Sequence, residues 1–203
     1  PDPPPVGVVE PKQNGERRVT VKKEAQLPLV FVGYPVPNYA SKDAPALELL
    51  STILSEGRSS RLYRRLVYEQ QIALYAAASY DRLSADPSLF YLYAAALPGK
   101  GSDQVERALY AEVERVQREP VSERELQKAK NQLEADFVLS QDSIFSLARQ
   151  IATYEMVASW REWERYVPGI RAVTRADVQR GARAYRTADN RTVGILVPLA
   201  MKE

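Results

Sequence analysis

Short stretches in which apolar residues alternate with polar ones, or run together, divide the chain into predicted strands. Val19 and Val21 alternate with polar neighbours, which is typical of a strand near a sheet edge, whereas the second stretch is mostly apolar and fits a more buried strand. Residues 84–87 are turn-forming and lie between two such stretches, so these predict an antiparallel hairpin. The predicted strands cover residues 16–23, 28–36, 74–83, 88–98 and 190–198.

Apolar residues recur at helical spacing in the segments between these strands. Ser122 with Glu125 matches a capping box, Thr174 is a good N-cap, and Ser41 or Asp43 is available to cap the first helix, which Gly57 ends. The predicted helices cover residues 42–56, 59–69, 102–118, 122–159 with a bend near 140–143, 160–167 and 174–185.

The longest of these helical regions carries an apolar stripe that we interpret as a packing face. Its members are Leu126, Ala129, Leu133, Phe137, Ile144, Leu147, Ile151 and Tyr154. Within the hairpin, Tyr91 and Tyr93 should point to one face of the sheet, and Phe90 and Leu92 to the other.

The order of strands and helices predicts an α+β fold, with a mostly antiparallel sheet and helices packed on one face. A proline-rich opening without apolar periodicity marks residues 1–15 as a linker or lead-in, which leaves residues 16–203 for one domain. A chain of 203 residues with 45% hydrophobic residues can bury a sizeable core.

Charge and apolar content narrow the range of partners. Lys and Arg number 28 against 26 Asp and Glu, so the net charge of +2 gives no strong positive field, and we expect no nucleic-acid partner. No run approaches the roughly 20 apolar residues that cross a bilayer, so we expect no membrane span. The sequence leaves the compartment open.

The chain contains no histidine and no cysteine. Histidine is the commonest ligand of catalytic zinc and the usual base at neutral pH, so HExxH and HxxEH zinc motifs and a Ser-His-Asp triad are excluded. The carboxylates Glu123, Glu125, Glu134 and Asp136 could in principle hold a metal, but their spacing does not bring them together. We therefore predict no catalytic residue and no metal ligand in this chain.

Three segments, in order, resemble the C-terminal domain of insulinase/pitrilysin-type zinc peptidases, a family that includes the mitochondrial processing peptidase. They are GRSSRLYRRLVYEQQIALY at 57–75, SERELQKAKNQLEADF at 122–137 and VTRADVQRGARAYRTADNRTVGILVP at 173–198. Each segment alone fits ordinary core packing. Their joint order and spacing carry the resemblance, which covers nearly the whole chain.

The resemblance implies a half-molecule of two similar domains, of which only the first carries an HxxEH zinc site. This chain would then be the non-catalytic second domain, which shapes the chamber in which a peptide is cut. No cofactor is expected in this chain, because zinc would sit on an HxxEH-bearing companion domain or subunit, the expected partner besides the peptide substrate. A periplasmic or other extracytoplasmic location is compatible with the resemblance.

Active members of the family carry an arginine and a tyrosine seven residues apart that hold the substrate backbone or the oxyanion. Tyr75 matches the tyrosine, but Tyr68 stands seven residues before it, and Arg65 lies ten residues before it. Either a one-residue insertion lets Arg65 or Arg64 reach the same space, or the domain lacks the pair and contributes only chamber wall. Tyr75 and Arg65 are the substrate-binding candidates, and half-burial of Tyr75 against the sheet is the structural alternative.

Other interpretations of the same residues stay open. The arginines Arg58, Arg61, Arg64 and Arg65 fit a solvated helix face, and Tyr75, Tyr80, Tyr91 and Tyr93 fit cross-strand packing rather than base stacking, since no RNP1-like motif is present. At the level of the whole domain, the alternatives are a structural or assembly domain, like the core proteins of the respiratory bc1 complex, and a stand-alone ferredoxin-like binding module.

Overall fold

The computed structural model describes residues 11–199, so the first ten residues of the predicted lead-in and the last four of the domain lie outside it. The strands are β1 (Arg17–Glu24), β2 (Leu29–Val36), β3 (Ala73–Tyr80), β4 (Ser88–Ala96) and β5 (Thr192–Leu199). The helices are α1 (Ala44–Ser55), the π-helix η1 (Tyr63–Glu69), α2 (Ser102–Arg118), α3 (Glu123–Leu139), α4 (Ile144–Val157), α5 (Arg161–Ala172) and α6 (Arg175–Tyr185).

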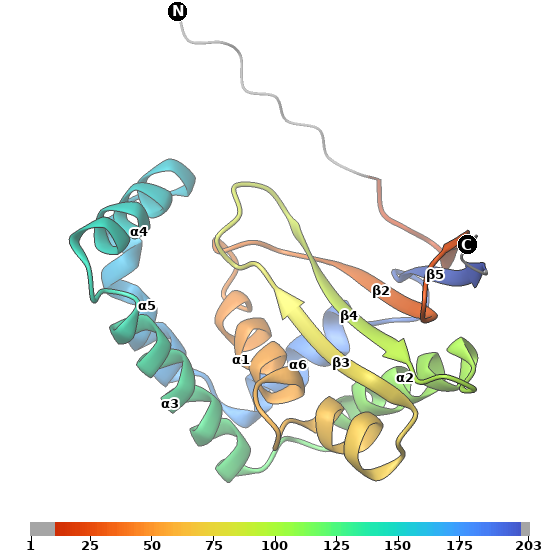
Figure 1. The fold of residues 1–203 in the computed structure, drawn as a ribbon. Helices are drawn as coiled ribbons and strands as arrows, with labels where there is room; N and C mark the ends of the chain where they lie inside the picture. The colour runs from red at the N-terminus through yellow and green to blue at the C-terminus, as the bar shows by residue number, and fades with distance from the viewer. Residues whose placement is uncertain (1–10, 200–203) are drawn as a thin grey trace, which may run out of the picture.

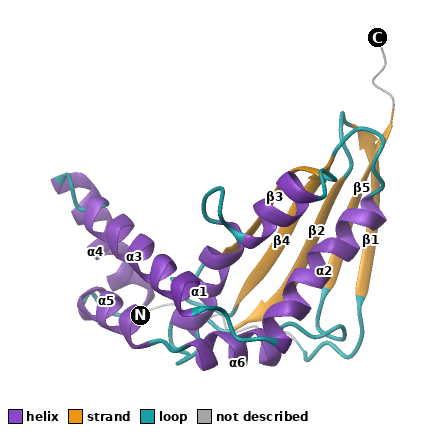
Figure 2. Ribbon diagram, turned by 90° about the horizontal axis from the view of Figure 1, so that it is seen from below, coloured by secondary structure: helices purple, strands orange, loops and turns teal. Residues whose placement is uncertain are grey.

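The strands form one twisted sheet in the order β1-β5-β2-β4-β3 (Figures 1 and 2). Only β1 and β5 pair in parallel, and the other neighbours are antiparallel, including the predicted β3–β4 hairpin. The strand β1 lies at an edge, as its alternating pattern predicted. The predicted α+β class with a mostly antiparallel sheet is confirmed.

One face of the sheet builds the hydrophobic core with α1, α2 and α6 (Figure 2). Alternate residues of β2 and β4, such as Val32, Phe90 and Leu92, are fully buried against Leu47 and Leu109 from the helices. Each such side chain contributes about 1.5–3 kcal/mol by leaving water. The prediction that Tyr91 and Tyr93 point away from the face of Phe90 and Leu92 is confirmed. Both tyrosines are half-buried, whereas Phe90 and Leu92 are buried in the core.

The helices α3, α4 and α5 extend away from the sheet as a second group whose main contacts with the rest are made by α1 (Figure 1). The predicted packing stripe is correct for Leu126, Ala129 and Tyr154, which are buried, and for Leu133 and Phe137, which pack partly buried against the core. It is wrong for Ile144 and Ile151, which are 89% and 37% exposed. The chain turns back between α3 and α4, so α4 packs on α5, and its Tyr154 hydroxyl accepts a hydrogen bond from Arg82, which follows β3.

Two predicted helices differ in the structure. The segment predicted as an α-helix over 59–69 is π-helical from Tyr63, with the amide of Gln70 bonded to the carbonyl of Arg65 at 3.0 Å. A π turn holds one more residue than an α turn, and apolar spacing does not separate the two over so short a segment. The helix predicted to end before Pro168 continues to Ala172, because burial of Tyr166 and Ile170 offsets the one backbone bond that proline removes.

The predicted caps form, except at the first helix. Ser122 with Glu125 closes a capping box on α3, and Thr174 with Asp177 closes another on α6. Asp43 stands at the start of α1, but its side chain accepts hydrogen bonds from Arg180 and Tyr185 instead of capping the helix. This contact fastens α6 to the start of α1.

Candidate functional site

Four aromatic side chains gather on the sheet face opposite the core. Phe31 stacks on Tyr91 and Tyr93 with ring centroids 5.1 and 5.8 Å apart, and Tyr75 meets Tyr93 edge-on at 6.1 Å. We call Phe31, Tyr75, Tyr91 and Tyr93 the aromatic face. Among the described residues, no helix covers this side of the sheet (Figure 2).

Strand register places these rings side by side. Phe31 of β2 pairs with Tyr93 of β4 on one side and with Gly194 of β5 on the other. Since Gly194 has no side chain, the space beside Phe31 stays open. The exposed valines Val19 and Val21 of β1 continue the apolar surface beyond Gly194.

The structure does not bring Tyr75 and Arg65 together. Tyr75 lies on the aromatic face and is 44% exposed, just after a register shift in the β3–β4 pairing. Arg65 lies on the helix-bearing side, where it donates to Glu69 at 2.7 Å and stands 3.8 Å from Glu112. The sequence-predicted pair is therefore split between two sides of the sheet.

The connection between η1 and β3 has an unusual backbone. Gln71 has a φ of 49°, in the left-handed region that favours glycine, and it is the only non-glycine residue with positive φ in the described chain. It follows the π turn directly and precedes the buried Ile72 and Ala73. Residue type does not signal this geometry, because Gln70 and Gln71 are both glutamine.

The arginines of the 58–65 segment do not all form the solvated helix face that fits their pattern. Arg58 and Arg64 are exposed, but the side chain of Arg61 is only 17% exposed and bonds Glu125 of α3 through two nitrogens. This bond lowers the pKa of the Glu125 carboxyl to about 2. Close by, burial raises the pKa of Glu112, a carboxyl flanked by Arg65 and Arg115 at 3.8 and 3.5 Å.

The donor set of this chain does not fit a zinc site. The sequence has neither histidine nor cysteine. Of the four carboxylates considered above, Glu125 is bound to Arg61 and Glu134 to Arg171, and residues 11–199 contain no group of three or more acidic side chains that converge. In the same part of the chain, no helix is long and apolar enough to cross a bilayer.

Comparison with known proteins decides the family. Residues 1–133 match the family model described as the peptidase M16 inactive domain. The chain belongs to the M16 peptidase family, as an inactive domain. The zinc protease PqqE of Helicobacter pylori (strain ATCC 700392 / 26695) is 34% identical to this M16 domain over 146 residues, which are 71% of the chain and 33% of that protein.

Solved structures agree with this assignment. A protease from Helicobacter pylori superposes with a TM-score of 0.90 at 30% identity, over 96% of this M16 domain and 47% of that chain. A chain of complex III from Candida albicans superposes with a TM-score of 0.73 over 88% of the domain and 45% of that chain, and its 15% identity shows the fold alone. The M16 domain thus spans about a third of its curated relative and about half of the structural ones.

Proposed function

We propose that this M16 domain forms the wall of a substrate chamber in a zinc metallopeptidase, with the zinc held by an HxxEH-bearing companion domain or subunit. Family membership supports the companion, since the zinc protease PqqE is about three times as long as the region that matches this domain. The absence of histidine from the sequence supports a non-catalytic role. The substrate is a peptide or an unfolded segment of a protein.

The aromatic face is the observation that carries this proposal. An unfolded peptide presents apolar side chains and unpaired backbone groups, and an open sheet face with stacked rings offers both contact area and polar tips. Phe31 and Tyr75 remain 39% and 44% exposed, although their size would favour burial in a domain that worked alone. Tyr75 adds a hydroxyl donor for a peptide carbonyl.

A second apolar surface supports contact with the companion. Ile144 and Phe145 at the start of α4 are 89% and 78% exposed, and Met156 near its other end is 87% exposed. Large exposed apolar side chains along one helix are typical of interaction surfaces. We assign α4 to the companion and the aromatic face to the substrate.

Two sets of variants test this division. In the reconstituted peptidase, Phe31→Ser with Tyr91→Ser should raise KM for an unfolded peptide while the affinity for the companion stays unchanged. The matched pair Phe145→Ser and Met156→Ser should weaken companion binding and leave the KM of the assembled enzyme unchanged. A rise in KM with the α4 pair and none with the aromatic pair would contradict the proposal.

A structural or assembly role is the second candidate, and the likeness to a chain of complex III favours it at the level of fold. In that case the same apolar surfaces would hold partner subunits and no peptide would be cut. An HxxEH motif with a downstream glutamate in the parent reading frame, or in a neighbouring gene, supports the peptidase. Its absence from both supports the assembly role.

A further inference from the structure

A buried arginine without a hydrogen-bond partner stands directly after α6. Arg186 is 3% exposed, and none of its three guanidinium nitrogens has a partner among the described residues. The guanidinium lies over the ring of Phe90, 3.7 Å from its centroid. Burial lowers its pKa to about 9, so the group still carries its charge at neutral pH.

A buried charge needs a partner, because the ring of Phe90 replaces only part of the hydration that a guanidinium loses. An arginine has five donors in a planar fork that matches two oxygens of one anion. In the structure, none of these donors meets a protein oxygen. The free-energy cost of removing the Arg186 guanidinium from water is therefore not offset by a hydrogen bond to any described protein oxygen.

Arg186 lines a pocket of about 330 Å³ between α2, α6 and the approach to β5. Arg183 and Arg191 line the same pocket, and Tyr34 lies in its wall. Three arginines thus surround a space in which Glu114 is the one lining acid. The local field in this pocket favours an anion.

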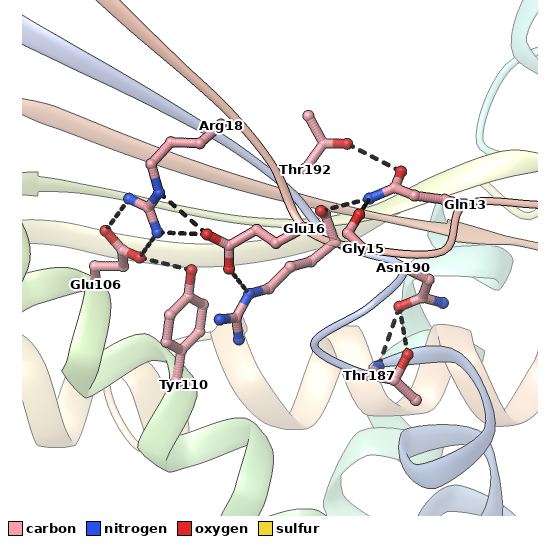
Figure 3. Close-up of polar contacts among 10 residues, drawn as sticks. Gln13, Gly15, Glu16, Arg18, Glu106, Tyr110, Thr187, Asn190 and Thr192 are labelled. Carbon is pink, nitrogen blue, oxygen red and sulfur yellow. Dashed lines mark hydrogen bonds and ion pairs between the residues drawn. The ribbon is translucent and has the colours of Figure 1, made fainter.

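The carboxylates around the pocket are already engaged by other arginines. Glu16 accepts hydrogen bonds from Arg18 and Arg191 (Figure 3). Glu106 accepts two hydrogen bonds from Arg18, at 2.9 and 2.6 Å, and one from Tyr110 at 2.8 Å. Glu114 accepts from Arg118 on the surface of α2 at 2.9 Å. No described carboxylate is left for Arg186.

We propose that this pocket binds a small oxyanion, with two oxygens of a phosphate or a carboxylate held by the fork of Arg186 and with Arg191 beside them. The nitrogens of Arg186 are covered in the present conformation, so entry requires movement at the mouth. Arg183, Thr187 and Ala188 line the exposed side of the pocket. Their displacement breaks the hydrogen bond from Arg183 to the carbonyl of Gln117 at 2.6 Å and the two from Thr187 to the side chain of Asn190 at 3.1 Å. This site is independent of the aromatic face.

Thermal unfolding of the chain in rising concentrations of inorganic phosphate tests the site, with sodium chloride holding the ionic strength constant. At a hundredfold excess over Kd, ligand linkage gives a rise in Tm of about 5–10 °C, which continues to grow with the logarithm of the anion concentration. A parallel titration with acetate distinguishes a carboxylate site from a phosphate site. A Tm that follows neither anion beyond the effect of chloride would overturn the proposal.

Two variants make the test specific. Arg186→Leu should abolish the anion-dependent rise, and in anion-free buffer its Tm should equal or exceed that of the wild type, because an unpaired buried charge is removed. Arg107→Leu replaces an exposed arginine of α2 that pairs with Asp103 outside the pocket, and this variant should keep the rise. An anion response retained by Arg186→Leu, or a lower Tm of that variant in anion-free buffer, would show that Arg186 is satisfied by the protein and overturn the proposal.

Discussion

The guanidinium of Arg61 donates two hydrogen bonds to the carboxylate of Glu125, from Nε to Oε1 at 2.7 Å and from Nη2 to Oε2 at 3.0 Å. The two residues are 64 positions apart in the sequence. Glu125 also accepts from the backbone amide of Ser122 at 2.9 Å, which closes the capping box. One carboxylate thus fixes the start of α3 and ties it to the segment before η1.

This contact predicts a pH dependence of stability. The bond to Arg61 lowers the folded-state pKa of Glu125 to about 2, below its ordinary value of 4.5, so the stabilisation is present above pH 4.5 and is lost as the pH falls towards 2. Chemical unfolding between pH 6 and 2 should show the wild-type advantage over Glu125→Gln shrinking across that window. Glu123→Gln, two residues away in the same first turn of α3, is the control and should keep the wild-type profile. Parallel profiles of wild type and Glu125→Gln would contradict the prediction.

Because the backbone at Gln71 is left-handed, we expect glycine at this position to make the folded domain more stable. The αL conformation costs an ordinary residue about 1–2 kcal/mol, and the added chain entropy of glycine costs about 0.5–1 kcal/mol, so Gln71→Gly should raise the free energy of unfolding by roughly 0.5–1 kcal/mol. Gln70→Gly is the matched control, because Gln70 has a φ of −87° and should lose about 0.5–1 kcal/mol. Denaturant unfolding measures both, and a loss of stability with Gln71→Gly would refute the strain.

Much of the fold follows from local patterns, whereas the exceptions depend on tertiary contacts. Alternation and capping residues locate all five strands and the starts of α3 and α6 to within a few residues. The exposure of Ile144 was not predictable, because helical spacing shows that a side is apolar without showing what covers it. The continuation of α5 past Pro168 depends on burial of Ile170, which the local sequence does not encode.

We expect substitution of the arginines of η1 to have only a small effect on catalysis. Arg64 and Arg65 both donate to Glu69 on the helix-bearing side, away from the aromatic face. In the reconstituted peptidase, Arg64→Ala and Arg65→Ala should each leave turnover within about threefold, because partly solvated ion pairs contribute little. A large loss confined to Arg65→Ala would instead place a working Arg-Tyr pair in this domain.

We expect the loss of the Tyr75 hydroxyl to have a larger effect on the rate of peptide cleavage. If its hydroxyl donates to the substrate in the closed chamber, Tyr75→Phe should lower the rate on peptides by roughly tenfold to a thousandfold, the scale of losing one donor to developing oxyanion charge. Thermal stability should stay near that of the wild type, since the ring contact with Tyr93 is kept. Tyr68→Phe, a 73% exposed tyrosine of η1, is the control and should not alter the rate. Equal rates for both variants would make Tyr75 a packing residue.

Only part of the candidate site can be predicted from the sequence. Alternation placed Tyr91 and Tyr93 on one face, but the contribution of Phe31 depends on the pairing of β2 with β4, which connects residues far apart in the chain. The burial of Arg186 was hidden for the same reason, because arginine after a helix usually faces water. The resemblance to zinc peptidases pointed to Tyr75, and local geometry then separated it from Arg65.

Peptide hydrolysis by purified components tests the central claim most directly. The HxxEH-bearing companion alone, this M16 domain alone and an equimolar mixture are compared on one unfolded peptide, with and without EDTA, and zinc content is measured for each. The account predicts EDTA-sensitive cleavage that is far faster in the mixture than with the companion alone, and no stoichiometric zinc or cleavage with this domain alone. EDTA-sensitive proteolysis by the isolated domain, or a companion that needs no second domain, would contradict it.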